Sequence, residues 1–392
     1  MTVHRLKFPV MFSFGFGQLA EAIKNSGFNV FLLFYYNQVL GVSATLTSVA
    51  LAIALMFDAV SDPLVGSFSD KLRTRFGRRH PLILMAALPL GLSFYCLFNP
   101  PSMTSDWAHF IWLLGFAILV RASLTLYHVP HLALGAELAE DYHQRSTLYA
   151  MSTFFGFLGG ALFVPVSYTL FFPTTDVFNP ALLNKAAYQP WSLMAAGLMI
   201  FAIVVCVIGT RREIPRLVQR VDSDARQLMR VSALIQEFRE AFNNRSFRAI
   251  FFGMMLSTLV LSVEGVFNPF MGFHFWGLTT EQLRWIPLAQ LVGLFLSLSL
   301  LPIMTRWLDK KRTLIVSALL VILNINIPIV LSLSGVSWFP AQGSQSLLIV
   351  LILSGLVTAV LAPIIFATLN SMFADIADEH ELDTGFRREG VI

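Results

Sequence analysis

The chain has 392 residues, of which 56% are hydrophobic and only 13% are charged, and its formal net charge is +4. A soluble domain carries about 25% charged residues, so this composition excludes a soluble protein and indicates a protein that crosses a membrane several times. Basic loops beside a bilayer account for the positive charge, and no nucleic-acid partner is needed to explain it.

Ten apolar runs are each long enough to cross a hydrocarbon core of about 30 Å as a helix. They cover residues 10–36, 44–67, 81–98, 108–136, 147–172, 190–210, 248–276, 284–305, 313–334 and 346–370. We therefore predict an all-α polytopic membrane protein with ten transmembrane helices. Its three parts are an N-terminal six-helix bundle at 1–210, a cytoplasmic linker at 211–246 and a C-terminal bundle at 247–392. Within the linker, apolar residues at helical spacing in 231–242 predict an interfacial helix.

Lys and Arg residues are distributed unevenly around these runs. All but four of the 27 precede the first run or lie in every second loop, the exceptions being Lys24, Arg121, Lys185 and Arg284. The positive-inside rule then places the N-terminus and these loops in the cytoplasm of a cell whose inner or plasma membrane holds the protein.

The second run contains two aspartates, Asp58 and Asp62, in an otherwise apolar sequence. A carboxylate at membrane depth costs at least roughly 2.5–3.5 kcal/mol, and two at i and i+4 lie on one helix face about 40° apart, so their charges oppose each other. Such a pair persists where a cation, a proton or a basic partner neutralises it. The pattern predicts ion or proton handling, and the alternative is an interhelical salt bridge. Pro63 frees backbone carbonyls nearby that could help to ligate a small cation.

Further polar residues form stripes on three predicted helices. On each helix the members fall within a narrow arc, about 40–80° wide, as helical geometry requires for a shared face. The stripes contain Glu21 and Asn25 with Lys24 beside them on the first helix, Arg121 and His128 on the fourth, and Glu264 and Asn268 on the seventh. We predict that they line a polar solute cavity, although Lys24 could instead neutralise Glu21, and Arg121 could pair with Asp58 or Asp62 as a structural lock.

The loop after the second run reads GSFSDKLRTRFGRRHP from Gly66, and TRWLDKKRT from Thr305 repeats its acidic residue and basic cluster in the second half. This repeat is typical of transporters of the major facilitator type, in which two six-helix halves are related as parallel repeats. A six-plus-six design needs two more helices, which we expect to follow Ile392. In the first of the two loops we interpret a set of residues as a cytoplasmic gate rather than a phosphate site: Asp70, Arg75, Gly77, Arg78 and Arg79.

Four stretches carry a resemblance to a known family: GFGQLAEAIKNSGFNVFLLFYYNQVLG (15–41), DAVSDPLVGSFSDKLRTRFGRRHP (58–81), YHVPHLALGAELAEDYHQRS (127–146) and ADIADEHELDTGFRREG (374–390). They resemble the glycoside–pentoside–hexuronide:cation symporters of the major facilitator superfamily, a group that includes melibiose permease and, more distantly, vertebrate sodium-coupled lysolipid transporters. The resemblance spans essentially the whole chain.

The resemblance implies a cation site made of Asp58, Asp62 and a hydroxyl on the fourth helix, which corresponds to Thr125. These hard oxygen ligands suit a small alkali cation, and the carboxylates could alternatively carry a proton. The chain departs from the sugar-binding pattern of melibiose permease, because His128 replaces an aspartate, Thr153 lies near the position of an arginine, and Glu21–Ala22 replaces a lysine–aspartate pair.

We therefore expect a cation-coupled symporter that works by alternating access, carries a sugar- or glycoside-type solute with Na⁺ or H⁺, and is not an enzyme. It should need no cofactor, since the His128–His131 pair lacks a third metal ligand and no nucleophile–base set is evident. Its partners should be a small-molecule solute, the cation and the lipid bilayer, and it should act as a monomer. Two alternatives stay open: the same fold carrying a lysolipid or another non-sugar solute, and a membrane receptor or scaffold without transport.

Overall fold

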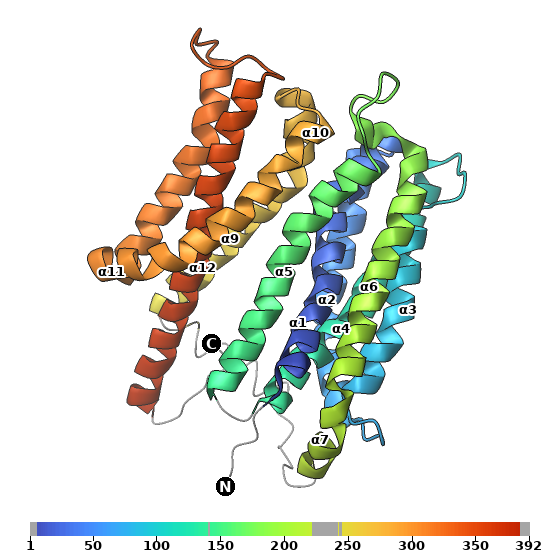
Figure 1. The fold of residues 1–392 in the computed structure, drawn as a ribbon, viewed down its shortest axis with the longest axis vertical. Coiled ribbons are helices and arrows are strands. Elements are labelled where there is room, and N and C mark those ends of the chain that lie inside the picture. Colours follow the sequence, from blue (N-terminus) through green and yellow to red (C-terminus); the bar gives the residue numbers. More distant parts are fainter. Residues whose placement is uncertain (1–5, 140–141, 222–241, 243–244, 385–392) are drawn as a thin grey trace. The chain divides into compact units, whose positions relative to one another are not determined.

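The computed structural model describes residues 6–139, 142–221, 242 and 245–384. These residues form helices joined by short connections, and none of them is in a strand (Figure 1). The chain divides into two compact units. One comprises residues 1–225 together with Thr279–Arg284, and the other comprises residues 226–278 together with 285–392.

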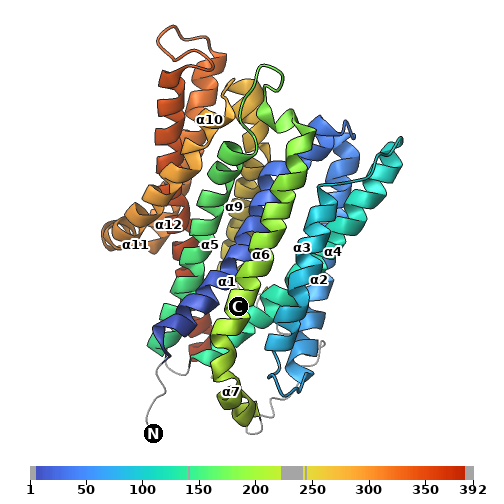
Figure 2. The same ribbon diagram turned by 45° about the vertical axis from the view of Figure 1, so that its right-hand side comes forward.

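The first unit is built from long helices and one short helix. They are α1 (Phe8–Ser26), α2 (Ala44–Lys71), α3 (His80–Leu97), α4 (Asp106–Leu138), α5 (Tyr142–Leu170), α6 (Tyr188–Thr210) and α7 (Ile214–Val221). Beyond α1 the chain stays helical through π-helical turns at Gly27–Leu32 and Tyr35–Val39. Helix α1 packs against α5 and α6, whereas α4 packs against α2 and α3 (Figure 2). This arrangement brings the polar residues of α2 and α4 to one helix–helix contact.

The second unit contains α9 (Arg245–Phe270), which continues as a π-helical turn at Met271–Phe275, and α11 (Trp285–Leu333) and α12 (Gln345–Thr384). The short α10 (Thr280–Leu283) belongs by its contacts to the first unit, although the residues on both sides of it belong to the second. Helix α11 is interrupted at Asp309, which has φ 64° and ψ 163°. A non-glycine residue in this region does not continue an α-helix, so α11 consists of two helical parts.

Eight stretches of the described helices are long and apolar enough to cross a membrane. One of them, residues 280–333, contains both the eighth and the ninth predicted runs on the two sides of Asp309. The first predicted run is helical in α1 but is not among the eight, because polar residues such as Glu21 and Lys24 dilute its apolar character. Large apolar side chains are exposed along the long helices, as expected where a helix faces lipid.

The core of the first unit is an aromatic cluster that joins α1, α3, α5 and α6. Its fully or almost fully buried members are Phe31, Tyr35, Phe94, Phe98, Phe172, Tyr188 and Trp191. The Trp191 indole N–H donates to Ser167 Oγ over 2.8 Å, and the Tyr36 hydroxyl donates to the Leu97 carbonyl over 2.8 Å. These two polar groups therefore have partners within the apolar core, which avoids the cost of an unsatisfied buried group.

Two glycines allow α1 and α4 to approach closely, Gly17 of α1 and Gly135 of α4, where an added Cβ atom would lie 2.7 Å from the Phe14 Cζ atom. A Cβ atom on Gly17 would lie 2.4 Å from the Tyr127 hydroxyl oxygen and 3.0 Å from the Cys206 Cβ atom. Any larger residue would push the helices apart, and the polar residues one turn further along α1 would then move away from those of α4.

The core of the second unit is smaller and aliphatic. It comprises Phe247, Ile250, Val321, Leu361, Ile364, Ile365 and Leu369. Within the predicted linker, α7 packs on the first unit, since Arg216 Nη2 donates to the carbonyl of Leu138 over 2.7 Å. The interfacial helix predicted at 231–242 lies outside the described residues except for Phe242.

Candidate functional site

Two pairs of polar residues face each other between α2 and α4. On α2 the aspartates are one turn apart, and on α4 Arg121 and Thr125 have the same spacing. Arg121 forms an ion pair with the Asp58 carboxylate, and Thr125 Oγ1 donates to Asp62 Oδ1 over 2.7 Å. Residues four apart lie on the same helix face, so Arg121 can lie opposite Asp58 while Thr125 lies opposite Asp62.

One oxygen of this set is left without a partner. Asp58 Oδ1 is buried and accepts no hydrogen bond from any described residue, although Asp58 Oδ2 is bound to Arg121. Ser61 lies beside it, with its Oγ 3.4 Å from the carbonyl of Asp58 and 3.5 Å from Thr125 Oγ1. Pro63 interrupts the hydrogen bonding of α2, because it has no N–H to donate to the carbonyl one turn earlier. Several oxygen atoms therefore converge at one level of the helix pair.

A second polar network lies between α1 and α4. The Glu21 carboxylate accepts hydrogen bonds from Gln18 and, over 3.5 Å, from Asn25. His128 Nδ1 lies 2.9 Å from Glu21 Oε2, although the contact lacks the alignment of a hydrogen bond. Ser152 of α5 donates to Gln18 Oε1 over 3.2 Å and so holds the network from a third helix.

Lys24 connects the two networks through an aromatic ring. Its side chain is buried, and its ammonium donates to Asn25 Oδ1 over 3.2 Å and lies 4.9 Å from the centre of the Phe28 ring. The Arg121 guanidinium lies 5.5 Å from the centre of the same ring. No carboxylate of the described residues forms an ion pair with Lys24, so its charge is balanced only at longer range.

His131 has a structural role. It is fully buried, its Nε2 lies 3.0 Å from the Phe14 carbonyl oxygen, and its ring stacks on that of Phe14 with 4.2 Å between the centres. The two histidines of the HxxH motif therefore differ, since only His128 faces an acidic side chain.

The structure thus brings together the predicted residues of the first unit: Glu21, Lys24, Asn25, Asp58, Asp62, Arg121, Thr125 and His128. Glu264 and Asn268 lie one turn apart on α9, in the second unit, and neither has a hydrogen-bond partner among the described residues. Sequence reasoning missed Ser61 and Ser152, which are small hydroxyls of the kind that also fill apolar helix contacts. It also missed a cluster in the second unit, where Asn324 Nδ2 donates to the Ser354 carbonyl over 2.8 Å.

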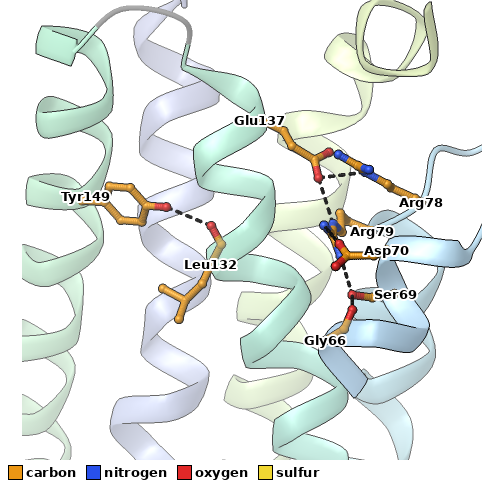
Figure 3. A network of polar contacts seen from close by, with 8 residues as sticks. All are labelled: Gly66, Ser69, Asp70, Arg78, Arg79, Leu132, Glu137 and Tyr149. Atoms are coloured by element: carbon orange, nitrogen blue, oxygen red, sulfur yellow. Dashed lines mark hydrogen bonds and ion pairs between the residues drawn. The ribbon is translucent and has the colours of Figure 1, made fainter. Parts of the chain in front are cut away.

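Three of the predicted gate residues, Asp70, Arg78 and Arg79, meet at the basic end of the first unit (Figure 3). Arg79 is buried and binds Asp70 and Ser69, and its Nε donates to Glu137 Oε1 over 2.9 Å. Arg78 Nε donates to the same Glu137 oxygen, also over 2.9 Å. Gly77 provides the positive φ of 78° that the turn before α3 requires.

Two features of this network were not predicted from the loop sequence. Glu137, at the end of α4, is the shared acceptor of both arginines, and nothing in the loop sequence points to it. Arg75 forms no ion pair with a described residue, and its guanidinium instead lies 4.9 Å from the centre of the Phe76 ring.

Intramembrane carboxylates beside a cationic or hydroxyl partner, as at Asp58 and Asp62, are typical of the ion and solute pathways of transporters. The family described as MFS/sugar transport protein matches residues 13–392, and the chain belongs to this family. Its relatives place it in the glycoside–pentoside–hexuronide:cation symporter family, so the chain is a cation-coupled symporter of the major facilitator type and a multi-pass membrane protein.

The relatives have low sequence identity to this chain, but the matches cover most of it. An uncharacterised symporter of Synechocystis sp. is 24% identical, and the match covers 100% of this chain and 82% of that protein. A glucuronide carrier protein homologue of Escherichia coli (strain K12) is also 24% identical, over 81% of this chain and 66% of that protein. The solved structure of the xylose transporter from E. coli in a partially occluded inward-open conformation has a TM-score of 0.57 at 15% identity, and covers 93% of this chain and 86% of that one. It supports the major facilitator fold.

Proposed function

We propose that the protein drives the uptake of a sugar- or glycoside-type solute with one monovalent cation, Na⁺ or H⁺, held by Asp58, Asp62 and Thr125. The observation that carries this proposal is the buried Asp58 Oδ1, which no described residue satisfies, one helical turn from the Asp62–Thr125 hydrogen bond. A buried oxygen with a negative charge and no donor is costly unless a ligand supplies one. A small cation or a proton at this position would remove that cost.

The charges of the two networks support a stoichiometry of one cation. Three carboxylates, those of Glu21, Asp58 and Asp62, lie near two basic groups, those of Lys24 and Arg121. These five groups together leave one negative charge unbalanced at membrane depth. One bound monovalent cation restores neutrality, whereas a divalent cation would overshoot it.

Coupling then follows from the cost of an unbalanced charge that is shut off from water. When solute is bound without the cation, the site keeps its unbalanced negative charge, and this charge opposes passage through the occluded state. The protein therefore changes conformation with cation and solute both bound or both absent, whereas the cation-free, solute-loaded protein cannot. The ion gradient thereby drives the solute. In the same scheme, the ion pairs of Arg78 and Arg79 with Glu137 would keep the cytoplasmic side closed in one of the alternating states.

The solute site of the first unit would be formed by Glu21, Lys24, Asn25, Arg121 and His128. Glu21, Asn25 and His128 offer the donors and acceptors that bind sugar hydroxyls. Lys24 hydrogen-bonds to Asn25 in this network, and its ammonium helps to balance the nearby carboxylates. The name of the E. coli relative, a glucuronide carrier protein homologue, makes glycosides that carry a carboxylate one class of solute to test. Glu264 and Asn268 of α9 would contribute from the second half.

An uptake experiment tests the proposal. Membrane vesicles containing the protein are supplied with labelled neutral glycosides, glucuronides and lysolipids, under a sodium gradient, a proton gradient or neither. We expect accumulation of a glycoside under only one of the two gradients. Accumulation of a lysolipid alone would instead establish the second candidate substrate, and the absence of gradient-driven uptake of any solute would contradict symport.

The cation site is tested with the accumulated solute. We expect Asp58→Asn and Asp62→Asn each to reduce gradient-driven accumulation by at least about tenfold, because each removes a charged ligand, while exchange of solute continues. Asp106→Asn is the matched control, since this residue begins α4 at the membrane edge and takes no part in either network. Undiminished accumulation in both site variants would refute the assignment.

A further inference from the structure

Phe28 is an aromatic side chain that two intramembrane cations share. It belongs to the π-helical turn at Gly27–Leu32, which continues α1, and it is 7% exposed. The Lys24 ammonium lies 4.9 Å from the centre of its ring, and the Arg121 guanidinium of α4 lies 5.5 Å from the same centre. Both distances are within the roughly 6 Å over which a ring face attracts a cation. Through Phe28, α1 therefore contacts the counter-ion of Asp58.

The ion pair between Arg121 and Asp58 uses only one of its two possible hydrogen bonds. Arg121 Nη1 donates to Asp58 Oδ2, whereas Arg121 Nε and Asp58 Oδ1 are both buried and have no hydrogen-bond partner among the described residues. A guanidinium and a carboxylate can join through two parallel hydrogen bonds, and that arrangement is the stronger one. Arg121 is therefore not drawn fully onto Asp58. The Phe28 ring is a second group that attracts the guanidinium, and it acts from α1 rather than from α2.

A cation that bound Asp58 would displace the guanidinium from that carboxylate. Arg121 would then carry its charge at membrane depth without its anionic partner, which is costly. An aromatic face reduces this cost, because its negative potential attracts the guanidinium. Unlike a second carboxylate, the ring adds no net charge and no oxygen ligand of its own. It can therefore hold Arg121 both before and after the exchange.

We propose that Phe28 is a positioning residue that allows the coupling cation to replace Arg121 at Asp58. The ring holds the guanidinium to one side, so that a single hydrogen bond must break when the cation binds, and it retains the guanidinium afterwards. Without the attraction of the ring, Arg121 would form the second hydrogen bond to Asp58 and would compete more strongly with the cation. This role rests on the proposed cation site of Asp58, Asp62 and Thr125, and it adds a residue that sets the affinity of that site.

Fluorinated phenylalanines at position 28 of the full chain test the proposal. One, two or three fluorine atoms progressively weaken the negative face of the ring and leave its shape almost unchanged. In membrane vesicles, the initial uptake of a labelled glycoside or glucuronide is measured against the concentration of the driving ion, Na⁺ or H⁺. We expect the half-saturating ion concentration to rise with each fluorine and to reach about five times the wild-type value, which corresponds to about 1 kcal/mol. The maximal rate at saturating ion should equal that of the wild type.

Phe31 is the matched control. It lies in the same π-helical turn, is fully buried and packs on the ring of Trp191, and no Lys or Arg of the described residues lies over its ring. The same fluorinated residues at position 31 should leave the half-saturating ion concentration unchanged.

Three results would overturn the role of Phe28 and leave the cation site in place. They are an unchanged half-saturating concentration in the position 28 series, an equal rise in the Phe31 series, and a loss of maximal rate alone, which would mean that the ring only supports the packing of α1. A wild type without ion-driven uptake would instead contradict symport itself, and this proposal with it.

Discussion

Arg121 occupies the place beside Asp58 for which a bound cation would compete. Its guanidinium is paired with Asp58 and lies over the Phe28 ring, next to Lys24. Arg121 thus acts as a tethered counter-ion that neutralises one of the two aspartates. The partner of Asp62, by contrast, is the neutral hydroxyl of Thr125, so Asp62 has no cationic partner among the described residues.

The pair predicts a measurable energetic coupling. Arg121→Gln should lower the thermal stability of the sodium-free protein, because it leaves the Asp58 carboxylate at membrane depth without its counter-ion. The double variant Arg121→Gln/Asp58→Asn should lose less stability than the two single variants together, by about 1–3 kcal/mol. Thermal unfolding in detergent measures the cycle. In the control cycle of Arg121→Gln with Asp106→Asn, the two losses of stability should simply add. If the losses also add for Arg121→Gln with Asp58→Asn, the ion pair contributes nothing to stability.

Among the secondary-structure elements, α10 has the most unusual attachment. It lies between two segments of the second unit, but its hydrogen bonds lead to the segment after α5 in the first unit. The Thr174 amide and hydroxyl each donate to one oxygen of the Glu281 carboxylate over 2.7 Å, and Thr280 Oγ1 donates to the carbonyl of Phe172 over 2.8 Å. Glu281 precedes the apolar run predicted at 284–305 and is partly exposed.

This attachment should depend on pH. Partial burial of Glu281 opposes its charged form, but the hydrogen bonds from Thr174 outweigh this effect and lower the pKa of Glu281 to about 2. Because the folded-state pKa lies below the ordinary value, the ionised carboxylate stabilises the fold above about pH 4.5, and this contribution disappears as the pH falls towards about 2. Glu281→Gln should therefore lower the melting temperature at neutral pH, and the difference from the wild type should shrink below about pH 4.5.

Asp176→Asn serves as the comparison for this pH series. Asp176 is an exposed carboxylate in the same connection after α5, and no described residue donates a hydrogen bond to it. Its replacement should leave the melting temperature unchanged at every pH. A difference between wild type and Glu281→Gln that stays constant down to pH 2 would show that the carboxylate charge is irrelevant to the attachment of α10.

For the whole molecule, the distribution of basic residues predicts the orientation in the membrane. Single cysteines introduced as Lys71→Cys and Lys185→Cys, in a background in which Cys96 and Cys206 are replaced by serine, report the two sides. The positive-inside rule predicts that a membrane-impermeant maleimide labels Lys185→Cys in intact cells and labels Lys71→Cys only after permeabilisation. The reverse pattern would contradict the orientation and would place the gate network on the outer side.

The helices and the polar stripes could be read from the sequence because both depend on short-range periodicity. An apolar run of about 20 residues must form a helix in lipid, since no other local structure satisfies its backbone, and residues four apart must then share a face. Asp58 and Asp62 were predictable as a pair for this reason. The break at Asp309 was visible only as a basic loop between two runs, and the participation of Glu137 was not visible, because it is 58 residues from Arg79.

The sequence alone thus determined the class of fold, the number of polar faces and the chemistry available on each, because these follow from composition and helical spacing. Only the tertiary structure decided which charges are paired. It placed Arg121 on Asp58 rather than on Asp62, His128 beside Glu21, and both Arg78 and Arg79 on Glu137. The physical reason is that an ion pair depends on distances of a few ångströms between separate helices, and these are set by close packing, such as that at Gly17, rather than by any local pattern.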